Sequence, residues 1–100
     1  MPDKRLERDD FVAALNTRFR VQAEPGAPVD LTLVQVSDLI AAPRQELFSV
    51  LFHGPPDTLL PQRMYRMENE RLGVIELFIV PIGQNADGYA YEAVFNRLKQ

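Results

Sequence analysis

The sequence predicts a small, mainly β domain, built as an antiparallel six-stranded barrel or tight sandwich with one short N-terminal helix. Of its 100 residues, 46% are hydrophobic, which is enough for a single core without disulfides or metal ions. Three apolar runs in the second half are rich in β-branched and aromatic residues and end at Gly, Pro, Asn or Asp, as strands do. They are FSVLF (48–52), VIELFIVPI (74–82) and YAYEAVF (89–95). The first two are apolar on both faces, so the sheet must close on itself or pack against a second layer.

Residues 1–8 are expected to form a solvated tail, and residues 9–98 a single β domain. Asp9 or Asp10 can cap a short helix, because a carboxylate accepts a backbone N–H of the first turn and suits that end of the helix dipole. Asn16 can end it. Its apolar stripe is formed by Phe11, Val12 and Leu15. Since a helix of about two turns is not stable alone, we expect it to dock on an open end or face of the sheet.

The six strands are expected over residues 19–23, 29–39, 46–53, 63–68, 74–82 and 89–97. Their connections are short, and strands joined by hairpins run antiparallel. In the second strand the alternation of apolar residues slips by one at Leu33-Val34, which predicts a β-bulge near residues 33–35. Residues 42–44 are expected to form a loop, and Asn85-Ala-Asp-Gly88 a hairpin turn.

Composition argues against several classes of function. The net charge is −3, from 11 basic and 14 acidic residues spread evenly over the chain, so there is no basic half to attract nucleic acid. The absence of cysteine excludes thiolate catalysis and cysteine-bound metals, and we expect no metal and no cofactor. The N-terminus is too charged for a signal peptide, and the longest apolar run is far shorter than the roughly 20 residues of a membrane span. We therefore expect a cytoplasmic protein without membrane association.

His53 is the only histidine and stands at the end of a predicted strand, directly before a Gly-Pro turn. It could act as a general base or a metal ligand. Because no second histidine and no cysteine accompanies it, a structural role at the strand end is the favoured interpretation. Ser49 lies on the same strand at a distance of about 13 Å, which is too far for a nucleophile and its base.

Glu76 and Glu92 lie on neighbouring predicted strands and could form a pair of carboxylates of the kind that glycosidases use. The favoured interpretation is that both face outward and meet Arg66 or Arg97 across the strands.

The loop over residues 54–61 combines a Gly-Pro-Pro turn with two leucines, Leu59 and Leu60. Apolar side chains exposed in a loop often mark a surface that binds a partner. The alternative is that the leucines fold under the loop and cap the barrel. We predict a partner-binding surface formed by Leu59, Leu60, Arg63 and His53.

Several strings in the chain match a known pattern. They are FSVLFHGP (48–55), LPQ (60–62) with Tyr65-Arg66, LG (72–73) through LFIVPIG (77–83), and YEAVFNR (91–97). Over residues 9–97 they resemble an uncharacterised bacterial family of small single-domain proteins, and YEAVFNR is the most specific string. Arg63 departs from the pattern, which favours glycine after Pro-Gln, so the turn there can differ. The resemblance supplies no activity, cofactor or catalytic residue. It implies an accessory role in a phage-tail-like assembly, because the relatives lie beside genes for phage-tail-collar-type proteins.

Two hypotheses about function follow. The first is a non-enzymatic interaction or assembly module that binds a protein partner or a second copy of itself, since the sequence specifies a core and no convergent polar groups. The alternative is a small ligand-binding or enzymatic β-barrel that uses His53 with nearby carboxylates at the barrel mouth.

Overall fold

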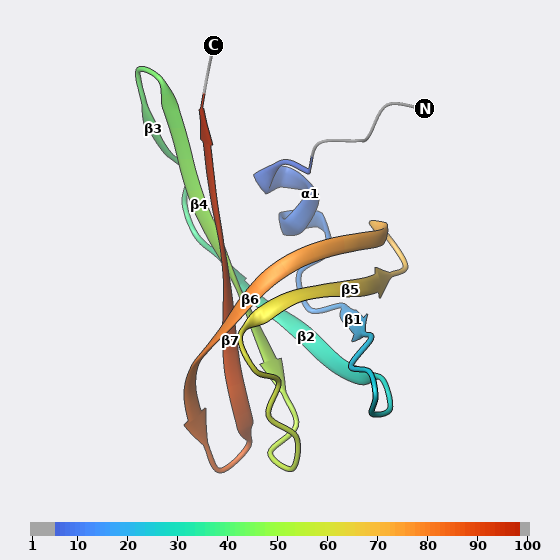
Figure 1. Cartoon of the computed structure of the whole chain (residues 1–100). Helices are drawn as coiled ribbons and strands as arrows, with labels where there is room; N and C mark the ends of the chain where they lie inside the picture. The colour runs from blue at the N-terminus through green and yellow to red at the C-terminus, as the bar shows by residue number, and fades with distance from the viewer. Residues whose placement is uncertain (1–5, 99–100) are drawn as a thin grey trace.

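The computed structural model describes residues 6–98 and confirms a mainly β domain with one short N-terminal helix (Figure 1). The helix is α1 (Arg8–Ala13), and the strands are β1 (Arg18–Val21), β2 (Val29–Val36), β3 (Ile40–Ala42), β4 (Gln45–Gly54), β5 (Arg63–Asn69), β6 (Gly73–Asn85) and β7 (Gly88–Leu98). All paired strands run antiparallel. Residues 6–98 form seven strands instead of the expected six. The sequence prediction missed β3, because its three side chains are all exposed and show no alternation.

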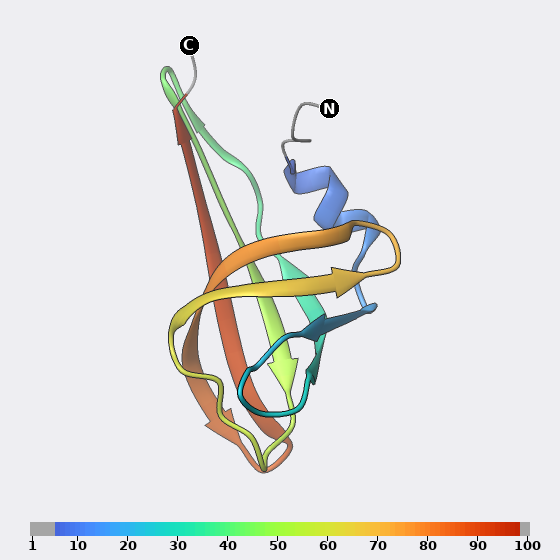
Figure 2. The same ribbon diagram turned by 45° about the vertical axis from the view of Figure 1, so that its right-hand side comes forward.

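The sheet closes into a ring, as expected. Its strand order is β2-β1-β5-β6-β7-β4-β3, and β2 also pairs with β4, so the six strands other than β3 return to their starting point. The ring is not a regular barrel, because β6 pairs with β7 only from Val80 onward. Before Val80, β6 turns away from β7 and follows β5 instead (Figure 2).

Beyond the ring, β4 and β7 continue together and form a projecting three-stranded arm with β3 (Figures 1 and 2). The arm comprises residues 40–49 and 94–98. β4 pairs with β7 along its whole length, and its other side pairs with β2 in one half and with β3 in the other. Ser37 lies where the chain passes from β2 to β3. Its N–H donates to the carbonyl oxygen of Ser49 and its hydroxyl accepts the N–H of Ser49, both at 2.8 Å.

The bulge predicted in β2 is confirmed, because the register with β4 shifts between Leu33 and Gln35. Val34 is the extra residue and is exposed, whereas Leu33 is buried. The core fills the ring. Its largest fully buried side chains are Tyr91, Phe11, Phe19, Phe52, Leu31, Leu33, Met67, Ile79, Val21 and Val50.

Helix α1 docks through Phe11 and Ala14, which are fully buried. The Phe11 ring centre lies 5.1 Å from that of Phe95 and 6.1 Å from that of Phe48. The assignment of Val12 to the apolar stripe is wrong, since this side chain is 39% exposed. Consecutive residues point about 100° apart on a helix, so burial of Phe11 turns Val12 toward solvent.

The start of the helix also differs from the prediction. Glu7, and not Asp9 or Asp10, is the N-cap residue, and its N–H donates to Oδ2 of Asp10 at 2.8 Å. Of the tail expected over residues 1–8, residues 1–5 lie outside the described residues. Leu6 packs against the core, and Nε of Arg8 donates to the carbonyl oxygen of Ser37 at 2.6 Å.

Candidate functional site

Three connections lie at the end of the molecule opposite the arm: the β1–β2 turn, the β4–β5 loop and the β6–β7 hairpin (Figure 2). We call this region the loop end and define it as residues 22–28, 55–62 and 85–88. Two grooves between these connections share Pro28, Val29 and Thr58, so the three segments form one continuous surface.

Two tyrosines from the core fix the backbone of the β4–β5 loop. The Tyr91 hydroxyl accepts the N–H of Leu60 at 3.0 Å and donates to the carbonyl oxygen of Thr58 at 3.4 Å. The Tyr65 hydroxyl donates to the carbonyl oxygen of Pro61 at 2.6 Å. Burial raises the pKa of both tyrosines, so both hydroxyls remain protonated at neutral pH. The loop is therefore held in place by groups that solvent barely reaches.

The structure separates the two loop leucines. Leu59 is 52% exposed, whereas Leu60 is only 3% exposed and belongs to the core. The predicted exposure is thus wrong for Leu60, because the hydrogen bond of its N–H to Tyr91 holds this part of the loop against the core. Leu60 caps the ring from inside, and Leu59 alone faces solvent.

A groove of about 510 Å³ lies between the β4–β5 loop and the β1–β2 turn. Residues 58–61 form one wall and residues 23–29 form the other, with Arg63 and Tyr65 between them. The Arg63 guanidinium lies 4.8 Å from the centre of the Tyr65 ring. Small and apolar side chains make up most of the lining, so the groove suits an apolar group of a ligand or partner. Three of the residues singled out from the sequence, Leu59, Leu60 and Arg63, line this groove.

His53 lies beside this groove, in a separate shallow pocket of about 380 Å³ that also contains Asp30 and Asp87. The Asp30 carboxylate is already engaged by two guanidinium groups, with Arg20 Nε at 3.1 Å and Arg18 Nη1 at 3.8 Å. The hydrogen bond to Asp30 raises the pKa of Arg20. A carboxylate held in this way is a poor partner for a catalytic histidine.

The other predicted pairs resolve into ordinary sheet contacts. Arg66 lies directly opposite Glu76 on the neighbouring strand, as expected. Glu92 lies opposite Val80 and Leu51, so it is not paired with Glu76 across the sheet.

Arg97 and Ser49 also take structural positions. Arg97 pairs with Glu7, at 3.3 Å from Nη1 to Oε2. Ser49 lies opposite Val94 on β7, and His53 lies opposite Ala90. Nothing in this register brings a base to the serine.

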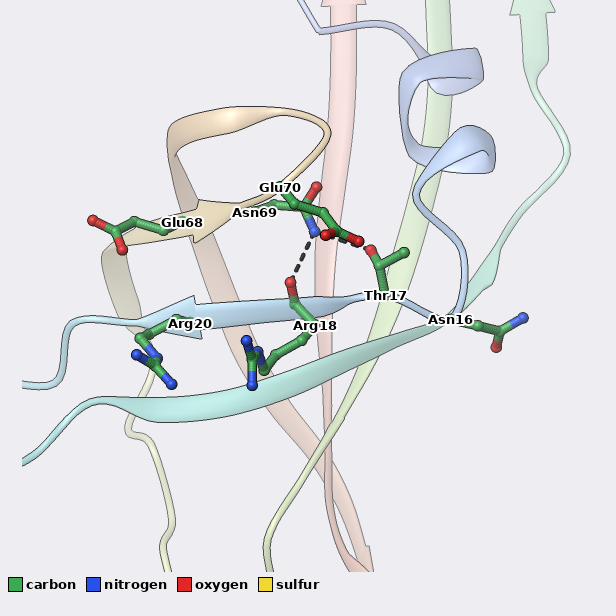
Figure 3. Close-up of a pocket in the computed structure, with 7 residues that line it drawn as sticks. All are labelled: Asn16, Thr17, Arg18, Arg20, Glu68, Asn69 and Glu70. Atoms are coloured by element: carbon green, nitrogen blue, oxygen red, sulfur yellow. Dashed lines mark hydrogen bonds between the residues drawn. The ribbon is translucent and has the colours of Figure 1, made fainter.

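A polar cleft of about 590 Å³ lies at the turn between β5 and β6 (Figure 3). Its central residue is Asn69, the one buried polar residue of the described chain. The Asn69 amide nitrogen donates to Thr17 Oγ1 at 2.9 Å and to the carbonyl oxygen of Arg18 at 2.8 Å. Its oxygen accepts the N–H groups of Arg71 and Leu72 at 2.9 and 3.1 Å. Every hydrogen-bonding group of this amide is satisfied within the fold, so Asn69 supports the turn and leaves nothing for a ligand.

Sequence reasoning missed the groove wall formed by residues 23–29. The residues Pro25-Gly-Ala-Pro28 are typical of a turn, but the sequence contains no signal for the long-range position of this turn beside the β4–β5 loop. Sequence reasoning also missed Asn69, for which the Asn-Glu-Arg-Leu-Gly turn sequence between two strands was the available signal.

Within residues 6–98, no group of three His, Asp or Glu side chains is close enough to hold a metal ion. The helix of the described chain is too short and polar to cross a membrane.

The protein is a small β domain whose sheet closes into a ring and whose loop end carries two adjoining grooves. The chain belongs to the family described as a domain of unknown function (DUF6916), whose pattern it matches over residues 6–95. This agrees with the resemblance to an uncharacterised single-domain family. Comparisons with curated proteins and with solved structures give no match.

Proposed function

We propose that this protein is a non-enzymatic interaction module that binds a protein partner through its loop end. The observation that carries the proposal is Leu59, which is half exposed on a loop whose backbone is fixed by the hydroxyls of Tyr65 and Tyr91. A flexible loop could turn a leucine away from water, but this loop holds it outward. Contact groups that are already ordered lose little entropy on binding, so such a side chain suits a partner interface.

The alternative, a ligand-binding or enzymatic role for His53, has one observation in its favour, namely the pocket that His53 shares with Asp87. The Asp30 carboxylate in this pocket is committed to Arg18 and Arg20. General acid–base catalysis requires a positioned partner group, and the interaction role is therefore better supported.

We extend the proposal to an accessory role in a phage-tail-like assembly of the bacterial cytoplasm. This part rests on the family resemblance of the sequence. A second apolar surface is compatible with it, because Ile40, Val94 and Leu98 of the arm are more than half exposed. A protein with separate apolar surfaces at its two ends can contact two neighbours.

The substitution Leu59→Asp tests the proposal, since the side chain lies outside the core. Val74→Asp is the matched control, because Val74 is 54% exposed and lies on β6 rather than at the loop end. Both variants should unfold within a few degrees of the wild type. We expect wild type and V74D to retain a cellular partner that L59D loses. With that partner purified, L59D should bind at least about tenfold more weakly.

Light scattering after size-exclusion chromatography distinguishes a second copy from a different protein. A defined oligomer that L59D converts to monomer would identify the partner as a second copy. If L59D and wild type bind every partner equally and have the same mass in solution, the loop end is not the interface.

A further inference from the structure

We infer that the partner of the loop end presents a basic segment with one large apolar side chain, an inference that rests on the proposed function. The groove beside Leu59 accepts the apolar group, and the charges around it select the flanking residues. Glu24 lines the groove, Asp57 lies two residues before Leu59, and Asp87 lines the adjoining His53 pocket.

These three carboxylates are exposed, and none forms an ion pair with another described residue. Asp57 accepts only a hydrogen bond from the hydroxyl of Thr58, at 3.3 Å. The carboxylates near the arm and the helix differ, because Glu7 pairs with Arg97 and Asp38 pairs with Arg8. The loop end therefore offers negative charge that the fold itself does not neutralise.

The countercharges near the groove are few. Arg63 is the one cation among the described residues that line it, and its guanidinium lies over the Tyr65 ring. The two cations Arg18 and Arg20 are balanced by Asp30, which pairs with both, and by Glu68, which lies opposite Arg20 on β5. The surface around Leu59 is consequently net negative at neutral pH, and lysine or arginine residues of a partner complement it. A second copy fits less well, because its loop end carries the same negative charge.

Selection from a displayed library of random peptides tests this inference. The library is first depleted of peptides that bind L59D, and the remaining peptides are then selected for binding to the wild-type protein. We expect the recovered sequences to carry lysine or arginine on both sides of a large apolar residue, and to bind more weakly as salt is raised. Synthetic copies should shift the NMR signals of residues 57–61.

The double variant Glu24→Gln with Asp57→Asn should bind these peptides about two- to fivefold more weakly at low salt. The matched control is Glu70→Gln with Glu76→Gln, which removes the same charge away from the loop end and should leave binding unchanged.

Two outcomes would overturn different parts of the inference. Leu59-dependent peptides without a basic excess, equally bound by the E24Q/D57N variant, would reject the basic partner and leave the loop end as an interface. Failure to recover any peptide that depends on Leu59 would reject both the basic partner and the proposed function.

Discussion

At Gly88, the β6–β7 hairpin approaches the backbone at the end of β4 more closely than any side chain would permit. A Cβ atom at this position would collide with the carbonyl oxygen of Gly54, and the φ of Gly88 is +147°, which residues with a side chain rarely adopt. Gly54 is confined by a side chain, because a Cβ there would lie 2.6 Å from Cδ2 of Leu31. The hairpin that borders the His53 pocket thus depends on two glycines.

Gly88→Ala should lower the free energy of unfolding by at least about 2 kcal/mol, since both the contact with Gly54 and the backbone angle resist a side chain. The control is Gly83→Ala, where a Cβ meets no atom within 4 Å. That variant should stay within about 0.5 kcal/mol of the wild type. Urea denaturation followed by circular dichroism measures both. Equal losses in the two variants would contradict this account of Gly88.

The two tyrosines that hold the β4–β5 loop predict how stability depends on pH. Burial is the main cause that raises the pKa of Tyr65 and Tyr91, so the folded state favours the neutral phenol more than the unfolded chain does. Their contribution is fully present below the unfolded pKa of about 10 and is lost as pH rises through the higher folded values. Urea midpoints should therefore fall above about pH 10.

The double variant Tyr65→Phe with Tyr91→Phe should show a shallower fall in this range, because it has no phenol to titrate at these positions. At pH 7 it should be less stable by about 1 kcal/mol per lost hydrogen bond. An unchanged slope above pH 10 would show that these hydroxyls are not the groups responsible.

At the scale of the element, helix α1 owes its position to the arm and not to its own six residues. The rings of Phe48 and Phe95 stack at 4.7 Å, and Phe11 packs against both. The Arg97 guanidinium lies 5.7 Å from the centre of each stacked ring and pairs with Glu7 at the start of the helix. Aromatic packing and a largely buried cation together tie the helix to β7.

Phe11→Ala should destabilise the protein by about 3–4 kcal/mol, because it leaves a cavity among the aromatic rings. Val12→Ala, on the exposed side of the same helix, should change stability by less than about 0.5 kcal/mol. Thermal and urea unfolding distinguish the two. A comparable loss at Val12 would mean that this side chain, as the sequence first suggested, contributes to docking.

At the scale of the whole molecule, the sequence predicted most strands because their signals are local. The expected strands at 46–53, 63–68, 74–82 and 89–97 match β4 to β7 closely, since apolar runs bounded by turn residues require no knowledge of distant segments. The bulge at Leu33 was recognisable from the same alternation. β3 carried no such signal.

Features that depend on distant residues were not predictable. Leu59 and Leu60 are identical neighbours, and the inward one is selected by Tyr91, which lies 31 residues away in the chain. The opposite wall of the groove comes from the β1–β2 turn, and its position follows from the pairing of β1 with β5. The candidate site therefore required the tertiary structure, whereas the sequence alone singled out the Leu59-Leu60 pair and Arg63 without showing which leucine is exposed.

The shared strand β4 also has a mechanical consequence. It runs from the arm to the loop end and is registered with β7 at ten positions, from Gln45 opposite Leu98 to Gly54 opposite Tyr89. A pull on the arm along these strands loads all ten positions in shear, so they resist sliding together and do not open one at a time. If neighbouring proteins bound both the arm and the loop end, the β4–β7 pair would transmit tension between them with little extension.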